Sequence, residues 1–358
     1  MSRRLRIAMI ASSRFPVSEP FAGGLEAHLW AASRELARRG HRVSLFAAPG
    51  SDAAVGVDTL QVDPLELTVA ATQDASMVEM GWLQEHHAYL DLMVRLAGPL
   101  ASSFDVVHNH SLHHLPVAMA RTIPMPMLTT LHTPPTPWLE SAIRVARGAG
   151  GRFVAVSAHT AASWQHTGQV PVLLNGIDVS RWPQGPGGTR LVWSGRMVAE
   201  KAPHLAIQAA RLAGLPLDLA GPVSDPAYFD ECVRPLLGDD VRHLGHLDHA
   251  QLAAVVGRSA ATLVTPDWDE PYGLVVAESL ACGTPVVAFA RGGVGEVLDA
   301  SCGRLVPAGD VQAMAAAVAD VTALDRDAAR RRAETACSID RMTDLYEDAY
   351  ADMLELAA

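Results

Sequence analysis

Short apolar segments bounded by turn residues alternate with longer stretches of helical periodicity along the chain. This alternation predicts β-α-β units built on parallel sheets. Strands are expected in a first series at residues 5–11, 41–48, 104–110, 126–132, 152–157 and 170–176. A second series is expected at residues 190–196, 215–221, 241–247, 261–266, 284–290 and 303–309. Two such series predict an α/β protein with two doubly wound lobes that share a cleft.

The segment between the two series differs from both. Residues 178–189, DVSRWPQGPGGT, are rich in glycine and proline and lack periodicity, so we interpret them as a linker between domains. The predicted domains are residues 1–178 and 179–339. Beyond them, apolar residues recur at helical spacing, which predicts an amphipathic helix over 340–358 that packs on one of the lobes. Its apolar positions are Met342, Leu345, Tyr346, Ala349, Tyr350, Met353 and Leu354.

The composition is typical of a folded protein with a small-molecule ligand. Of the 358 residues, 49% are hydrophobic and 19% are charged, unlike the composition of a disordered chain. The length suits two domains that each bury a core. The formal net charge of −11 argues against a general affinity for nucleic acid or anionic membranes, because both require a basic face.

The four cysteines bear on the cellular compartment. Cys232, Cys282, Cys302 and Cys337 lie far apart without C-x-x-C spacing, so we expect buried thiols in a reducing environment. The start, residues 1–15, fits a first strand better than a signal peptide, because its apolar run is short. No run approaches the ~18 to 20 apolar residues of a membrane span. The expectation is a cytoplasmic protein.

Two glutamates flank a predicted turn. Glu270 precedes Pro271 and Gly273, and Glu278 follows eight positions later in the first turns of a predicted helix. A carboxylate accepts hydrogen bonds from the vicinal hydroxyls of a ribose or a hexose. We therefore expect Glu278 to bind a ribose and Glu270 to bind the sugar of one nucleotide sugar. The alternative is two solvated glutamates around a helix start.

The same helix start could hold the phosphates of such a ligand. The free N–H groups of Gly273, Leu274 and Val275 would face an anion, and the helix dipole would favour it.

The only lysine of the chain lies near another predicted strand end. Of the 28 basic residues 27 are arginine, and Lys201 follows Arg196 in the segment SGRMVAEK, directly after the first strand of the second series. Both side chains could neutralise a pyrophosphate there. In the first lobe, Gly23 and Gly24 precede an amphipathic helix and would let backbone approach a phosphate or sugar. The alternatives are solvated surface cations and a flexible glycine turn.

Histidines are concentrated after two predicted strands. The segment VVHNHSLHH carries His108, His110, His113 and His114, and TTLHTPP carries His132. Alternation would place His108 and His110 on one face, but no Asp, Glu or Cys stands at ligand spacing, so we expect no metal site. A histidine at a strand end that faces the cleft can instead hydrogen-bond a sugar hydroxyl. We favour His110 for that role and a structural role for His108.

Taken in order, these fragments resemble the retaining GT-B glycosyltransferases of family 4. The similarity covers most of the chain and is specific because many short motifs keep their order. The motifs are GGLE (23–26), HNH (108–110), TLHT (130–133), VS (156–157), NGID (175–178), GR and EK within 195–201, the E-x7-E pair with GLVVAESLACGTPVVA (270–288), GG..E (292–296) and LVPAGD (305–310).

The resemblance implies two Rossmann-like domains facing a cleft. The first, 1–178, would be the acceptor-side domain, completed by helix 340–358 crossing back onto it. The second, 179–339, would bind the nucleotide sugar. Gly24 would lie against the diphosphate, and no cofactor or essential metal is implied.

The resemblance also implies roles for five residues. Arg196 and Lys201 would hold the donor diphosphate, Glu278 would bind the ribose, and Glu270 would contact the transferred sugar. His110 would lie beside that sugar near the reacting centre. The implied reaction is transfer with retention from a nucleotide-diphosphate sugar, with UDP favoured by the family, to a hydroxyl of a soluble small molecule.

Two details qualify the resemblance. The glycine that usually follows the lysine in this family is replaced by Ala202 and Pro203, which leaves the path of that loop open. The DWD segment, Asp267 to Asp269, matches a metal-binding D-x-D pattern of some glycosyltransferases. Basic side chains and helix N–H groups could already neutralise the phosphates, so we expect no metal here.

Other functions remain open at this point. A phosphorylase of the same fold would need a pyridoxal-bearing lysine, and the only lysine is assigned to the diphosphate; an epimerase is a related alternative. A non-catalytic nucleotide-sugar-binding or partner subunit belongs to another class. A glycolipid-directed transferase would need a basic amphipathic helix in the first lobe, but the candidate, 76–100, carries several acids and one arginine.

Overall fold

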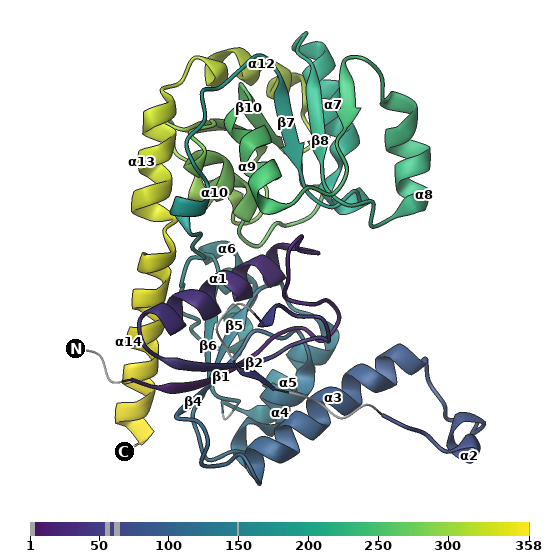
Figure 1. Cartoon of the computed structure of the whole chain (residues 1–358), viewed down its shortest axis with the longest axis vertical. Coiled ribbons are helices and arrows are strands. Elements are labelled where there is room, and N and C mark those ends of the chain that lie inside the picture. The colour runs from purple at the N-terminus through teal and green to yellow at the C-terminus, as the bar shows by residue number, and fades with distance from the viewer. Residues whose placement is uncertain (1–3, 54–57, 61–64, 149, 358) are drawn as a thin grey trace.

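The computed structural model describes residues 4–53, 58–60, 65–148 and 150–357 (Figure 1). Within them the chain forms two parallel six-stranded sheets, one in each lobe. The first sheet has the order β3-β2-β1-β4-β5-β6 and the second has the order β12-β11-β10-β7-β8-β9. In both, the strand order reverses direction once, so each lobe is Rossmann-like and the predicted fold class is confirmed.

The strands are short and apolar. Those of the first lobe are β1 (Arg6–Ile10), β2 (Arg42–Phe46), β3 (Asp58–Leu60), β4 (Val106–Asn109), β5 (Met127–Leu131) and β6 (Arg152–Ala155). Those of the second lobe are β7 (Leu191–Ser194), β8 (Leu217–Ala220), β9 (Val241–His243), β10 (Ala261–Val264), β11 (Val286–Phe289) and β12 (Gly303–Val306).

Helices cover both faces of each sheet. The first lobe carries α1 (Gly24–Arg38), α2 (Val69–Thr72), α3 (Met80–Ala97), α4 (His114–Met119), α5 (Pro137–Ala146) and α6 (Ala158–Ser163). The second carries α7 (Pro203–Leu212), α8 (Pro226–Tyr228), α9 (His249–Gly257), α10 (Leu274–Ala281), α11 (Val294–Val297), α12 (Val311–Thr322) and α13 (Arg326–Ala336). None of these described helices, nor α14 (Ile339–Ala357), is long and apolar enough to cross a bilayer.

Burial on both faces explains why the strands are apolar throughout. Alternate residues of β1, Ile7 and Met9, join a core with α1, whereas Ala8 and Ile10 join a second core with α3. A strand covered on both sides needs apolar residues at every position.

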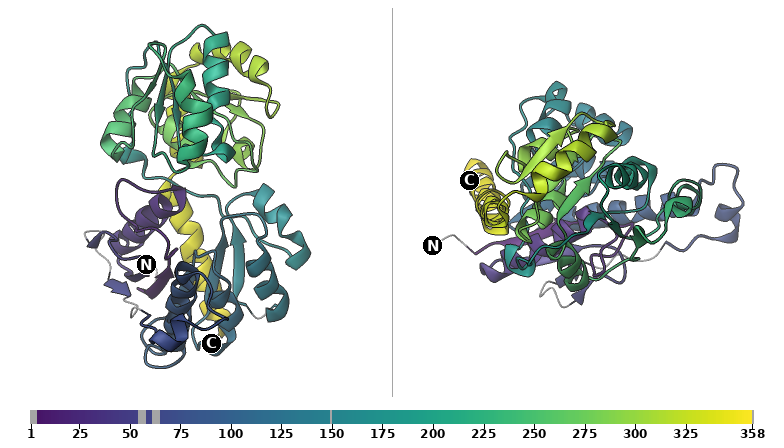
Figure 2. Two further views of the ribbon diagram at one scale, coloured as in Figure 1. Left: turned by 90° about the vertical axis from the view of Figure 1, so that its right-hand side faces the viewer. Right: turned by 90° about the horizontal axis from the view of Figure 1, so that it is seen from above.

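The last helix returns to the first lobe, as the resemblance implied. Met342, Tyr346, Tyr350 and Met353 of α14 are buried in the core that contains β1 and α1. Figure 1 shows α13 in the second lobe continuing into α14 along one side of the first, and the left view of Figure 2 shows α14 behind the first sheet. Residue 358, the end of the predicted helix, lies outside the described residues.

The two chain crossings between the lobes run side by side. The Ile177 N–H donates to the Cys337 carbonyl at 2.8 Å, and the Ile339 N–H donates to the Ile177 carbonyl at 2.8 Å. A β-carbon on Gly176 would overlap the Ser338 carbonyl, so the sequence needs glycine at this contact. The two segments that connect the lobes are therefore hydrogen-bonded to each other.

In the first lobe one predicted strand was wrong and one strand was not predicted. Residues 170–176 form only an isolated bridge, between Ala155 and Val172, because Pro171 has no N–H to donate to a ladder. The sixth strand is instead β3, which pairs with β2. Its three residues are too few to give a recognisable apolar pattern.

Candidate active site

One cavity of about 550 Å³ lies between the lobes. It is lined by loops that follow β1 in the first sheet and β7 and β10 in the second, where each strand order reverses. Nine residues nominated from the sequence line it together: Gly23, Gly24, Arg196, Lys201, Glu270, Gly273, Leu274, Val275 and Glu278. The tertiary fold therefore brings residues from three separate segments to one site.

Lys201 and Glu270 pair with each other in the unliganded cavity. The Lys201 ammonium forms an ion pair with the Glu270 carboxylate, and the Trp268 indole N–H donates to the same carboxylate at 3.1 Å. The ammonium also lies 4.9 Å from the centre of the Trp268 ring, within cation–π range. Arg196 is likewise paired, with Glu200 at 2.7 Å. Both basic side chains thus hold carboxylates where an anionic ligand could bind.

The loop that carries Lys201 has a backbone conformation that usually requires glycine, although the residue there is alanine. Ala202 adopts the left-handed conformation, with φ of 44° and ψ of 53°, and is fully buried. This conformation costs a non-glycine residue about 1–2 kcal/mol. The Thr265 hydroxyl lies 3.1 Å from the Lys201 carbonyl and 3.0 Å from the Ala202 carbonyl and donates to them. The substitution noted in the sequence is therefore accommodated by a hydrogen bond from β10's loop.

Glu270 is positioned by two glycines from another loop. The Gly293 N–H donates to the Glu270 carbonyl at 2.7 Å. A β-carbon on Gly292 would overlap the Glu270 backbone, and Gly292 also has a left-handed φ of 64°. The GG..E motif thus packs against the loop that carries the candidate sugar ligand.

Helix α10 begins at the cavity, as the sequence predicted. Gly273 caps it with a φ of 91°, which favours glycine, and its first N–H groups have no acceptor within the helix. Glu278 lies one turn further on and is half-buried. Burial raises the pKa of this carboxyl to about 7, since desolvation disfavours its charged form.

The first lobe approaches closely at the glycine pair. Gly23 caps α1, and a β-carbon on Gly24 would lie 3.1 Å from the Leu274 side chain across the cleft. Glu26, in the first turn of α1, is buried, and burial raises the pKa of its carboxyl even though Arg196 lies near enough to oppose this. Glycine at 24 leaves room for a ligand between the lobes.

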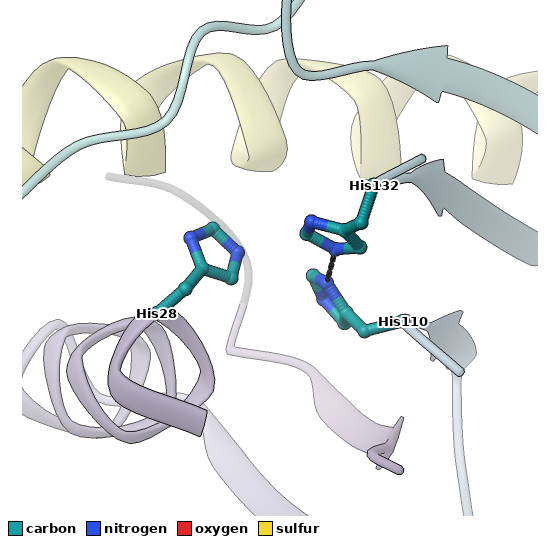
Figure 3. Close-up of side chains that lie close together, drawn as sticks. All are labelled: His28, His110 and His132. Carbon is teal, nitrogen blue, oxygen red and sulfur yellow. Dashed lines mark hydrogen bonds between the residues drawn. The ribbon is translucent and has the colours of Figure 1, made fainter. Parts of the chain in front are cut away.

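The histidines differ from their predicted arrangement. His108 is fully buried and bonded to Tyr350 at 2.6 Å and Thr130 at 2.8 Å, as expected for a structural residue. His110 is also fully buried and does not line the cavity. The Nδ1 atom of its ring instead lies 2.9 Å from the Nε2 atom of His132, to which it is hydrogen-bonded (Figure 3). Of the histidines near His110, His28 and His132 line the cavity.

Burial also fixes the charge state of these rings. It lowers the pKa of His28 to about 4 and holds the pKa values of His110 and His132 well below the usual range. All three imidazoles are therefore neutral at physiological pH.

The DWD carboxylates do not line the cavity. Arg291 contacts Asp267 at 2.8 Å and Asp269 at 3.5 Å, while Trp268 between them lines the cavity. Sequence reasoning assigned no role to Trp268, Thr265 or His28. The sequence could have indicated His28, because it follows the glycine pair on the same helix. It could also have indicated Trp268, because that residue lies two positions before Glu270.

Sequence profiles of two families match the chain. The profile of glycosyl transferases group 1 matches residues 181–336, and that of glycosyltransferase family 4 matches residues 22–181. A glycogen synthase of Mycobacterium tuberculosis is 30% identical over 383 residues, covering 93% of this chain and 89% of that protein. A D-inositol 3-phosphate glycosyltransferase of Mycolicibacterium smegmatis is 27% identical, covering 90% and 84%.

Solved structures share the fold. AviGT4, a glycosyltransferase involved in avilamycin A biosynthesis, matches with a TM-score of 0.71 and 22% identity over 98% of both chains. Anabaena HepE in complex with UDP-glucose matches with a TM-score of 0.74 and 18% identity, covering 98% of this chain and 100% of that one.

Proposed function

This chain belongs to the group 1 glycosyltransferases, and on that premise we propose that it transfers a hexosyl group from a UDP-sugar to a hydroxyl of a soluble small molecule, with retention. Membership of the family makes it a hexosyltransferase. The donor, the acceptor and the stereochemistry are our proposals. Solved structures of one neighbour, Anabaena HepE, contain UDP-glucose or UDP, which favours UDP as the donor nucleotide.

The observation that carries the proposal is the contact between Lys201 and Glu270 at the start of α10. In a nucleotide sugar the transferred sugar is bonded directly to the diphosphate, so their ligands must be neighbours. Lys201, Arg196 and the N–H groups of α10 would hold the diphosphate, and Glu270 would accept hydrogen bonds from the sugar. Glu278 would bind the ribose.

These groups can stabilise the leaving diphosphate without a metal. Lys201, Arg196 and the helix N-terminus aim positive charge at the oxygen where negative charge develops, which contributes much of enzymatic rate acceleration. In the proposed mechanism the acceptor hydroxyl attacks on the face from which the diphosphate leaves. The departing phosphate oxygen takes the acceptor proton, so no side-chain base is required. His110 acts indirectly, by orienting His132 toward the cavity.

The first lobe favours a soluble acceptor. Helix α3, the candidate membrane-binding helix, contains Glu85 and Asp91 with Arg95 as its one arginine. Such a helix would not be attracted to anionic lipid. Relatives named for glycogen and for D-inositol 3-phosphate are compatible with several hydroxyl-bearing acceptors. We place the protein in the cytoplasm, consistent with its free thiols, of which Cys282, Cys302 and Cys337 are buried and Cys232 is partly buried.

The first test is donor binding. Melting temperatures would be recorded with UDP, GDP, ADP and TDP and their common sugar conjugates, each with and without EDTA. We expect a selective rise with UDP compounds that EDTA does not change, because only ligands of the folded state stabilise it. If no nucleotide raises the melting temperature, a non-catalytic role replaces this proposal.

The second test is turnover by variants. Lys201→Ala and Glu270→Ala should each reduce kcat/KM by ~100-fold or more, the scale of losing one electrostatic contact to the transition state. Arg211→Ala is a matched charge control, since Arg211 pairs with Asp240 and does not line the cavity. Near-normal turnover in both cavity variants would contradict the assignments.

A further inference from the structure

Three histidines from separate elements converge beside the cavity. His28 lies on α1, His110 directly follows β4, and His132 directly follows β5. Each offers one ring nitrogen, and these three atoms lie within 4.8 Å of one another. In Figure 3, His28 lies opposite the hydrogen-bonded pair of His110 and His132. No two of these residues are close enough in sequence for a local motif to reveal the group.

Two of these rings have unmet hydrogen-bonding capacity. The Nε2 atom of His110 and the Nδ1 atom of His28 are buried and have no hydrogen-bond partner among the residues that the structure describes. An unsatisfied buried polar atom carries a cost in folding free energy, so native structures seldom retain one without a reason. A ligand that accepts lone pairs would remove this cost.

We propose that His28, His110 and His132 bind one divalent transition-metal ion, with Zn²⁺ as the best fit. Neutral imidazole is the form that binds zinc, and three histidines with an open fourth position are an established type of zinc site. Nitrogens around tetrahedral zinc lie about 3.3 Å apart, given Zn–N bonds of about 2.0–2.1 Å. The three nitrogens lie within 4.8 Å of one another, so even the widest separation would need to close by at most about 1.5 Å, which small side-chain rotations can provide.

The surroundings of the three rings support this assignment. The other nitrogen of His28, Nε2, lies 3.3 Å from the hydroxyl of Tyr346, an interaction of the kind that orients metal-binding imidazoles. Tyr346 lies on α14, so the site would also depend on the returning helix.

The open coordination position would face the cavity. His28 and His132 line the cavity and His110 does not, so a fourth ligand must come from the cavity side. A water or an acceptor hydroxyl could take that position. The inference goes beyond the proposed function, whose donor site lies on the second lobe and uses no metal.

The measurement is a titration with Co²⁺, which reports its coordination through visible absorption. The protein would carry no histidine tag. We expect one equivalent of Co²⁺ to produce the intense visible bands of a tetrahedral centre, and one equivalent of Zn²⁺ to abolish them. Absence of these bands at Co²⁺ concentrations up to the millimolar range would overturn the proposal.

Variants assign the bands to these residues. His132→Gln should weaken Co²⁺ binding by at least about 10-fold, the lower end of what even outer-shell changes cost at metal sites. His132 is only half-buried, so this variant is the safest to fold; His28→Gln is a second. Circular dichroism would verify folding of both. Unchanged Co²⁺ binding in folded His132→Gln and His28→Gln proteins would contradict the site.

A second histidine group provides the matched control. The rings of His86, His113 and His114 also offer nitrogens within 4.8 Å of one another, but all three are half-buried. His113→Gln should leave the visible bands unchanged. Loss of the bands in His113→Gln, with retention in His132→Gln, would move the ion to the other group and overturn the proposal.

The two proposals fail separately. Stabilisation by UDP with EDTA present tests the donor site alone, whereas Co²⁺ bands without nucleotide test the three histidines alone. UDP binding without Co²⁺ bands refutes only the metal site, and Co²⁺ bands without UDP binding refute only the donor assignment.

Discussion

The position of Lys201 shows how a single residue can narrow the range of possible functions. It is the only lysine in the chain, and it forms an ion pair at the cavity instead of lying in solvent. Its partner, Glu270, receives a second hydrogen bond from Trp268, so a donor must break or share an existing contact. In the proposed function, donor binding would therefore exchange a carboxylate for a phosphate at the lysine.

In the proposed function, Glu278 should make donor binding depend on pH. Its pKa in the unliganded protein is raised to about 7 by burial, and a ribose hydroxyl donates to the charged form. Affinity for UDP should therefore rise with pH, approaching tenfold per unit below pH ~7 and levelling off above it. Titrations of UDP between about pH 5.5 and about pH 8.5, roughly 1.5 units either side of the pKa, would show this. Glu278→Gln should give a flat profile, and an equally steep profile in that variant would exclude Glu278.

The same shift predicts the pH dependence of stability. The folded-state pKa is raised above the unfolded value of ~4.3, so the folded protein favours the protonated carboxyl. This contribution to the free energy of unfolding is fully present below about pH 4 and is lost as the pH rises through about 7. Urea unfolding of the wild type and Glu278→Gln would isolate it as the difference between their pH profiles. A difference that grows with falling pH in favour of the glutamine variant would contradict this sign.

At the scale of elements, the site depends on where strands end. The loops after β7 and β10 meet because their strands are neighbours, paired at Ala261–Leu191 and Thr262–Val192. Lys201 and Glu270 are 69 residues apart in sequence yet in contact. The ends of neighbouring parallel strands meet at one edge of a sheet, so short motifs after strands become one site.

Thr265 should link loop geometry to stability. It is buried, it accepts a hydrogen bond from the Trp193 indole at 3.1 Å, and it donates to the carbonyls of the loop that carries Lys201. Thr265→Val keeps the shape but leaves these groups unpaired, at an expected cost of about 1–3 kcal/mol in the free energy of unfolding. Urea unfolding measures the cost, and UDP titration should show weaker binding.

Thr322→Val is the control for this variant. Thr322 is exposed and bonded only to the Ala319 carbonyl, so its change should stay within about 0.5 kcal/mol. Equal stability of both variants, with unchanged UDP binding, would show that Thr265 does not hold the loop.

At the scale of the whole molecule, α14 and the paired crossings unite the lobes. The helix supplies five large buried side chains to the first lobe although it follows the second in sequence. A charge network fixes its outer side, because Arg39 of the α1 end contacts Glu35 at 2.7 Å, Asp344 at 2.5 Å and Glu347 at 2.6 Å. The first lobe is therefore complete only when the end of the chain is present.

Arg39→Ala tests this attachment. Only 17% of the Arg39 side chain is exposed, so removing it takes one partner from the buried Glu35 carboxylate, which keeps Arg38, and one from Glu347, which keeps His41. We expect the free energy of unfolding to fall by about 1–3 kcal/mol, between the values for exposed and buried ion pairs. Arg38→Ala is the control, since Arg38 makes similar pairs at 66% exposure and should cost less than about 1 kcal/mol. Losses below about 1 kcal/mol in both variants would show that α14 is held by packing alone.

The sequence by itself determined the elements and most of the donor cavity. Apolar runs, glycine positions and the position of the single lysine are local features, and eleven of the twelve predicted strands formed. Periodicity could not reveal β3, because three residues carry too little pattern, and it overvalued 170–176, where Pro171 blocks a ladder. Local sequence patterns predict secondary structure correctly where burial and turn geometry are set by neighbouring residues.

Only the tertiary structure decided which distant side chains meet. It paired Lys201 with Glu270, buried His110 behind the cavity surface, and brought His28 from α1 to His132 after β5. These contacts depend on how helices cross the sheets and how the lobes face each other, and no residue spacing along the chain encodes that directly. The candidate metal site therefore results from long-range packing, whereas the residues of the candidate donor site were already predicted by the sequence motifs.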